Sequence, residues 1–144
     1  CATPEVTEAM TKIHSFSMLC APILSQVAAV EALRAQKEVA SMRRQYHQRR
    51  NFMVEELNRI GLDTVEPNGA FYCFSSIAKY KLSSLEFAKR LLFEYKVAVV
   101  PGPAFGPGLD QYVRMSYANS LDHLKEAVSR IEEFVGKLSK EQSV

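Results

Sequence analysis

The segment that most constrains the fold is a Gly/Pro-rich loop between two short extended runs, Val97–Val100 and Gln111–Ala118. The first run is rich in β-branched residues, which predicts a strand that is covered on both faces or lies centrally in a sheet. The loop between the runs has the sequence PGPAFGPG at residues 101–108. Its prolines stiffen the backbone, so we expect a rigid loop that presents Phe105; a plain connector is the alternative.

The second run carries a single cation, Arg114. Because side chains alternate along a strand, Val113, Met115 and Tyr117 share one face and belong against helices. Arg114 then points from the opposite face, which the helices leave open. A planar guanidinium there is suited to bidentate hydrogen bonding with a carboxylate. The alternative is an arginine that pairs with a local acid or lies flat over Tyr112.

Two further patterns near this segment are candidate binding sites. The glycines of the loop would let backbone amides approach an anion, but the loop lacks the Gly-Lys-Ser/Thr ending of a phosphate-binding P-loop and does not run into a helix. The turn Pro67–Gly69 precedes an aromatic-rich strand, in which Tyr72 is expected in the core. Gly69 either serves the turn or allows a ligand to approach closely.

The periodicity of the chain predicts five helices and four short strands. The helices are expected at residues 4–14, from 22 onward, 39–60, 84–95 and 121–138, and the strands at 62–65, 70–77, 97–100 and 111–118. This order predicts an α/β fold with a small three- to four-stranded sheet that is covered mainly on one face by helices. Residues 38–144 would form one domain, and residues 1–37 a helical connection. The tail from Ser139 is expected to fray.

Three of the predicted helices show apolar stripes that should face the core. We expect burial at Met42, Tyr46, Met53, Leu57 and Ile60, at Leu85, Ala88, Leu91, Leu92 and Tyr95, and at Leu121, Leu124, Val128, Ile131, Val135 and Leu138. Ser83 with Glu86 matches a capping box, and Asn119 or Ser120 should cap the last helix.

Composition places the chain among ordinary globular proteins, with 47% apolar residues, 24% charged residues and a net charge of +2. We therefore expect no nucleic-acid partner. RRQYHQRR at residues 43–50 leaves binding along a nucleic-acid phosphate backbone as an alternative to a solvated helix face.

No apolar run is long enough for a membrane span, and a cytoplasmic location is expected. Three scattered cysteines indicate reduced thiols, and no spacing predicts a metal site. We identify no Ser/His/Asp or Cys/His catalytic set.

Three motifs occur together and in order: PNGAFYCF at 67–74, VAVVPGPAFG at 97–106 and YVRMSYANS at 112–120. They resemble the C-terminal part of class I aminotransferases of the pyridoxal-phosphate fold type I, most of all the aspartate and aromatic aminotransferase branch. CATPEVTEAM at 1–10 and MLCAPILSQVAAVEAL at 18–33 are similar to the family's segment after its cofactor-binding lysine. The resemblance implies a small domain that closes over a cofactor held by a larger N-terminal domain, in an enzyme that is a homodimer.

In that family the arginine of the YVRxSYA motif binds the α-carboxylate of the amino acid substrate, so the resemblance assigns this role to Arg114. With Gly69, it makes up the candidate substrate-binding residues. The resemblance also implies pyridoxal 5'-phosphate, amino acids and 2-oxo acids as the parent enzyme's cofactor and substrates.

The chain departs from the family in one respect: none of its lysines lies in the Ser-Lys segment that carries the Schiff base. That lysine anchors the cofactor and shuttles the proton, so we expect no catalytic residue here, no specific binding of the cofactor by this chain alone, and a fragment that is inactive alone. Two alternatives stay open: a free-standing α/β interaction or ligand-sensing module, and a fold-type-I lyase or decarboxylase.

Overall fold

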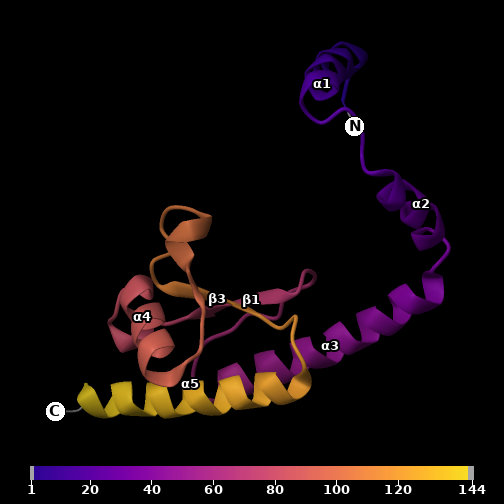
Figure 1. The fold of residues 1–144 in the computed structure, drawn as a ribbon. Coiled ribbons are helices and arrows are strands. Elements are labelled where there is room, and N and C mark those ends of the chain that lie inside the picture. Colours follow the sequence, from indigo (N-terminus) through magenta and orange to yellow (C-terminus); the bar gives the residue numbers. More distant parts are fainter. Residues whose placement is uncertain (1, 143–144) are drawn as a thin grey trace. The chain divides into compact units, whose positions relative to one another are not determined.

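A computed structural model describes residues 2–142 (Figure 1). The contacts between Cα atoms divide the chain into two compact units, with the division between Ser41 and Met42. Its helices are α1 (Pro4–Ser17), α2 (Ile23–Ala32), α3 (Gln36–Arg59), α4 (Ser84–Tyr95) and α5 (Leu121–Glu141). Its strands are β1 (Tyr72–Ser76), β2 (Val100–Pro101) and β3 (Tyr112–Ser116), and the 3₁₀ turns are η1 (Ala78–Tyr80) and η2 (Gly102–Phe105).

The second unit is built on an antiparallel three-stranded sheet in the order β1-β3-β2. Strand β3 is central, and its Arg114 pairs with Phe74 of β1 on one side and Val100 of β2 on the other. The later part of α3 and the length of α5 run below the sheet, and α4 lies at its end (Figure 1). This confirms the predicted α/β fold with a small sheet.

One core joins the sheet to these three helices. It contains Met53 and Leu57 from α3, Phe87 from α4, and Met115 from β3. The predicted stripe of α5 is confirmed: five of its six residues are buried, and Leu121 at the helix start is half-buried. Phe134, which the stripe did not include, is fully buried as well.

The caps form as predicted at the starts of α4 and α5. The Ser83 hydroxyl accepts a hydrogen bond from the Glu86 backbone N–H at 3.2 Å, and the Ser120 hydroxyl accepts one from the His123 backbone N–H at 3.3 Å. Each satisfies one of the unpaired N–H groups of a first helical turn.

The predicted apolar stripe of α4 was partly wrong. Leu85 and Leu92 are exposed, whereas Phe87 is buried. The helix is turned so that Ser84, at 0% exposure, faces inward and donates a hydrogen bond to the Asp110 carboxylate at 2.9 Å. Helix α3 begins three residues earlier than expected. Its Met42 is exposed because the part of α3 that packs against the core begins only at Tyr46.

Predicted strand positions also need correction. Residues 97–99 are not in a strand, and β2 lies at the sheet edge, because β3 takes the central position. Val97 and Val99 instead pack against the core from one side. Residues 62–65 contribute a single isolated bridge, between Thr64 and Ser75, instead of a strand. The α5 helix continues to Glu141, so the tail does not fray from Ser139, and residues 143–144 lie outside the described part.

The first unit consists of α1, α2 and the first turns of α3. Neither α1 nor α2 has a buried residue. Large apolar side chains such as Phe16, at 94% exposure, therefore have no core of their own within this unit. Across residues 2–142, no helix has the length and apolar character needed to cross a bilayer.

Candidate carboxylate-binding site

The two faces of β3 differ in burial, as the alternation of side chains along a strand predicts. Val113 and Met115 are 0% and 4% exposed and face the helices, as does Tyr117 just beyond the strand. Arg114 lies on the opposite face and is half-buried. The strand thus fixes the arginine backbone through pairing on both sides and directs the side chain away from the core.

Two aromatic rings contact the Arg114 guanidinium. Its Cζ atom lies 4.3 Å from the centre of the Phe105 ring and 4.9 Å from the centre of the Tyr72 ring. Both distances are within the range of cation–π attraction. The ring partners are thus Tyr72 and Phe105 instead of Tyr112, the ring that the sequence suggested.

The guanidinium has no ionic partner within residues 2–142. No acid in this range forms an ion pair with Arg114, and none of its N–H groups donates a hydrogen bond to a described residue. Two other half-buried arginines have ionic partners, since Arg50 pairs with Glu66 at 2.8 Å and Arg90 with Glu141 at 3.1 Å. The half-buried Arg49 resembles Arg114 in having a ring contact, with Tyr46, and no recorded ion pair. Arg114 therefore keeps its charge and its donors available for a ligand.

The rings belong to an aromatic cluster formed by Tyr72, Phe74 and Phe105. Tyr72 and Phe74 lie two residues apart on β1, so they share one face of that strand, and Phe74 stands directly opposite Arg114 in the register. The Phe74 ring meets the Phe105 ring edge-on at 5.5 Å and the Tyr72 ring at 6.3 Å. The expectation that Tyr72 lies in the core was wrong, since it is half-buried on the open face.

The η2 turn carries Phe105 to this face. Within the loop, a Cβ atom added to Gly102 would lie 1.9 Å from the backbone oxygen of Leu109, so only glycine fits at this close approach. The same Leu109 oxygen accepts a hydrogen bond from the Tyr112 N–H at 3.0 Å. The loop is therefore folded tightly onto the start of β3, which brings Phe105 over Arg114.

Gly69 lies in a different place. It is exposed beside a hollow of about 210 Å³, whose lining includes Arg43, His47 and Arg50 of α3. A Cβ atom on Gly69 would meet open space, and the left-handed backbone conformation falls on the next residue, Ala70, at φ 63°. Within residues 2–142 nothing requires a glycine here, and no recorded hydrogen bond or ring contact links it to Arg114.

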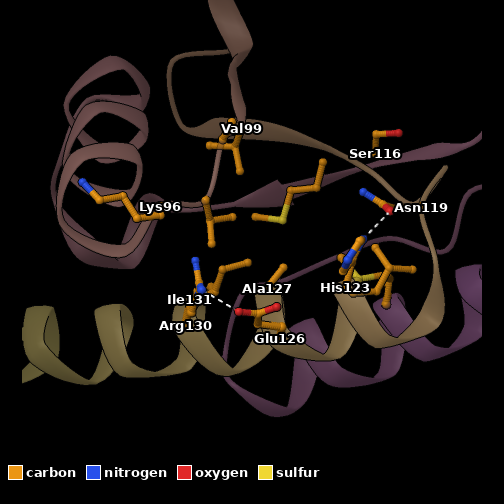
Figure 2. A pocket seen from close by; sticks show the side chains of 14 residues that line it. Lys96, Val99, Ser116, Asn119, His123, Glu126, Ala127, Arg130 and Ile131 are labelled. Atoms are coloured by element: carbon orange, nitrogen blue, oxygen red, sulfur yellow. Dashed lines mark hydrogen bonds and ion pairs between the residues drawn. The ribbon is translucent and has the colours of Figure 1, made fainter.

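A second hollow, of about 340 Å³, lies on the helix side of the sheet between α5 and residues 96–99 (Figure 2). Four of its polar side chains bind one another: His123 bonds to Asn119 at 3.0 Å, and Glu126 forms an ion pair with Arg130. Met115, the inward-facing neighbour of Arg114, contributes to the lining. Arg114 is not among the residues that line this hollow.

The lysines of the chain lack the surroundings that activate an amine as a nucleophile. Burial or a neighbouring cation activates such an amine by lowering its pKa. Every lysine of the chain is exposed, and a hydrogen bond from Lys137 to Glu94 at 2.8 Å raises the pKa of that lysine. Within residues 2–142, no three His, Cys, Asp or Glu side chains are grouped to hold a metal ion.

Comparisons with known proteins agree with this architecture. The family model for aminotransferase class I and II matches residues 1–131. The putative aminotransferase YugH of Bacillus subtilis is 48% identical over 131 residues, which cover 90% of this chain and 34% of that protein. Aromatic-amino-acid aminotransferase 2 of Thermococcus litoralis is 44% identical over 135 residues, which cover 91% of this chain and 35% of that protein.

Solved structures show the same likeness. The crystal structure of an aromatic aminotransferase from Pyrococcus horikoshii superposes with a TM-score of 0.90 at 39% identity, covering 95% of this chain and 38% of that one. The chain thus spans about a third of the length of its relatives. With matching motifs, fold and family model, it belongs to the class I and II aminotransferase family.

Proposed function

We propose that this chain is the C-terminal part of a pyridoxal-phosphate-dependent aminotransferase, which transfers an amino group between an amino acid and a 2-oxo acid. Residues 38–144 would form the small domain, and residues 1–37 the connection to a larger N-terminal domain. Membership of the family supports this proposal, as does the coverage of 34% of the first relative's length. The parent enzyme would be a cytoplasmic homodimer.

In this proposal Arg114 binds the substrate α-carboxylate. This role is supported by one observation: the Arg114 guanidinium has no ionic partner in residues 2–142 and lies on the open face of the central strand. A carboxylate approaching that face can accept two parallel N–H bonds, which gives both affinity and a fixed orientation. Gly69, which is exposed and lines the hollow of about 210 Å³ beside α3, is proposed as a second point of substrate approach.

Pyridoxal phosphate would be held outside this chain, since its exposed lysines do not suit the attachment. When bound, the cofactor supplies the electron sink of the reaction. The contribution of residues 38–144 is to hold the carboxylate and so orient the substrate against the reactive group.

The test is the substitution Arg114→Ala in the full-length enzyme that contains this chain. Loss of a charge-assisted hydrogen bond costs about 1.5 to 3 kcal/mol, so kcat/KM for amino acid substrates should fall about 10- to 150-fold, mainly through KM. Steady-state kinetics in both half-reactions measure this.

Arg44→Ala is the matched control, because Arg44 is an exposed arginine on α3 with no recorded partner in residues 2–142. Its kinetics should equal those of the parent. If Arg114→Ala also leaves KM unchanged, Arg114 does not bind substrate. Detection of a decarboxylated or cleaved product in place of the 2-oxo acid would favour the lyase alternative.

A further inference from the structure

The Arg114 side chain needs something to hold it in place. An arginine side chain carries about 2 kcal/mol of rotamer entropy, and a free guanidinium would sample many positions before it met a carboxylate. In this structure no acid or carbonyl group within residues 2–142 restrains Arg114. The recorded contacts of its guanidinium are the rings of Phe105 and Tyr72.

Phe105 makes the closer of the two contacts, at 4.3 Å against 4.9 Å for Tyr72. Its own position is fixed at both ends. The η2 turn fixes its backbone, and the Phe74 ring meets it edge-on at 5.5 Å. Phe74 in turn stands opposite Arg114 in the β1–β3 register. Loop, β1 and β3 therefore converge on one guanidinium.

A ring restrains a guanidinium differently from an acid. The π face attracts the cation without accepting its in-plane N–H bonds, so those donors stay free for a ligand. The ring also removes water from one side of the charge, which strengthens a hydrogen bond formed on another side. A carboxylate in the same place would occupy the donors and neutralise the charge.

We propose that Phe105 is a positioning residue for substrate binding: its ring holds the Arg114 guanidinium oriented on the open sheet face before the carboxylate arrives. This inference rests on the proposed carboxylate role of Arg114. Preorganisation lowers the entropy lost on binding, so it should act on substrate affinity more than on the chemical step.

Phe105 suits a substitution experiment better than Tyr72, because it lies on the η2 turn at 43% exposure instead of within a strand. Phe105→Leu keeps an apolar side chain but removes the π face. A cation–π contact is worth about 0.5 to 2 kcal/mol, which corresponds to a rise in KM of about 2- to 30-fold with kcat much less affected. Phe105→Tyr should restore most of the affinity.

The decisive measurement is a double-mutant cycle in the full-length enzyme. If Phe105 acts through Arg114, the Arg114→Ala/Phe105→Leu enzyme should have the same KM as Arg114→Ala alone. Phe93→Leu is the matched control, since Phe93 is an exposed phenylalanine of α4, at 69%, with no recorded ring contact. Its KM should not change.

The 144-residue chain by itself allows a direct structural readout. In its ¹H–¹⁵N NMR spectrum, the Arg114 Nε–Hε resonance should be shifted by the ring current and should move toward the free-arginine position in Phe105→Leu. Unchanged backbone amide resonances elsewhere would establish that the variant folds.

Two results separate the inference from the function beneath it. If Arg114→Ala raises KM but Phe105→Leu changes neither KM nor the Nε–Hε resonance, the positioning role is wrong and the carboxylate role stands. Additive KM effects in the double mutant would also overturn the positioning role. If Arg114→Ala itself leaves KM unchanged, Arg114 does not bind the substrate carboxylate, and the positioning role of Phe105 is excluded together with that proposed function.

Discussion

The two faces of β3 show how one strand serves two purposes. On the closed face, Val113 and Met115 are almost fully buried against α3, α4 and α5, and no buried side-chain N or O atom in residues 2–142 lacks a hydrogen-bond partner. On the open face, Arg114 has ring contacts but no acid. Stability is therefore concentrated on one set of alternate residues and, under the proposed function, substrate binding on the other, so the two can be changed separately.

The largest expected effect is on the closed face. Met115→Ala removes a side chain at 4% exposure from the centre of the core and should lower the free energy of unfolding by about 2 to 5 kcal/mol. Urea denaturation followed by circular dichroism measures this loss. The adjacent Ser116→Ala, at an exposed position, removes hydroxyl hydrogen bonds to the Phe71 carbonyl and from the Ala118 N–H, and should cost only about 1 kcal/mol. Equal losses in both variants would contradict the division between the faces.

A smaller effect on the closed face appears at alkaline pH. Burial raises the pKa of Cys73, the residue opposite Met115, to about 11 from an ordinary value of 9.0. Between these values the unfolded chain loses the thiol proton while the folded chain keeps it. The stability contributed by the neutral thiol is therefore complete below pH 9 and lost as the pH rises to about 11.

Unfolding free energies measured across this range should fall by up to about 3 kcal/mol more in the parent chain than in Cys73→Ala. Burial also raises the pKa of Tyr80 to about 12, so a shallower decline should persist in that variant. Cys20→Ala, which changes an exposed thiol, is the control and should keep the parent's pH profile. An unchanged profile in Cys73→Ala would show that Cys73 is not the group responsible.

The smallest effect is expected for stability on the open face. Arg114→Ala removes two cation–π contacts at a half-buried position and should cost about 1 to 2 kcal/mol. The same urea titration measures it. A loss as large as that of Met115→Ala would mean that Arg114 stabilises the fold as strongly as a core residue does. The proposed division of roles between the two faces would then be wrong.

The features that the sequence predicted well are those that local periodicity encodes. The stripe of α5 from Leu121 to Leu138 and the alternation around Arg114 follow directly from the repeat of a helix and of a strand. The caps at Ser83 and Ser120 depend on neighbours three residues away. For these elements the tertiary structure adds little that the local pattern does not already specify.

The errors arise where two local patterns compete or where distant residues meet. Helix α4 offers two overlapping apolar stripes, and the hydrogen bond from the buried Ser84 to Asp110 accompanies the one that contains Phe87. The run at residues 97–99 is β-branched but finds no strand partner in the described chain. The aromatic cluster depends on the β1–β3 register and on the path of η2, and neither can be obtained from spacing alone.

Gly102 has a consequence for how this loop can vary among sequences. Its neighbours Pro103 and Ala104 are exposed, and the loop can accept many residues there. At Gly102 any side chain would collide with the backbone of Leu109, and no change of rotamer relieves a clash that begins at Cβ. A substitution at Gly102 would therefore push the loop away from Leu109 and move Phe105 with it.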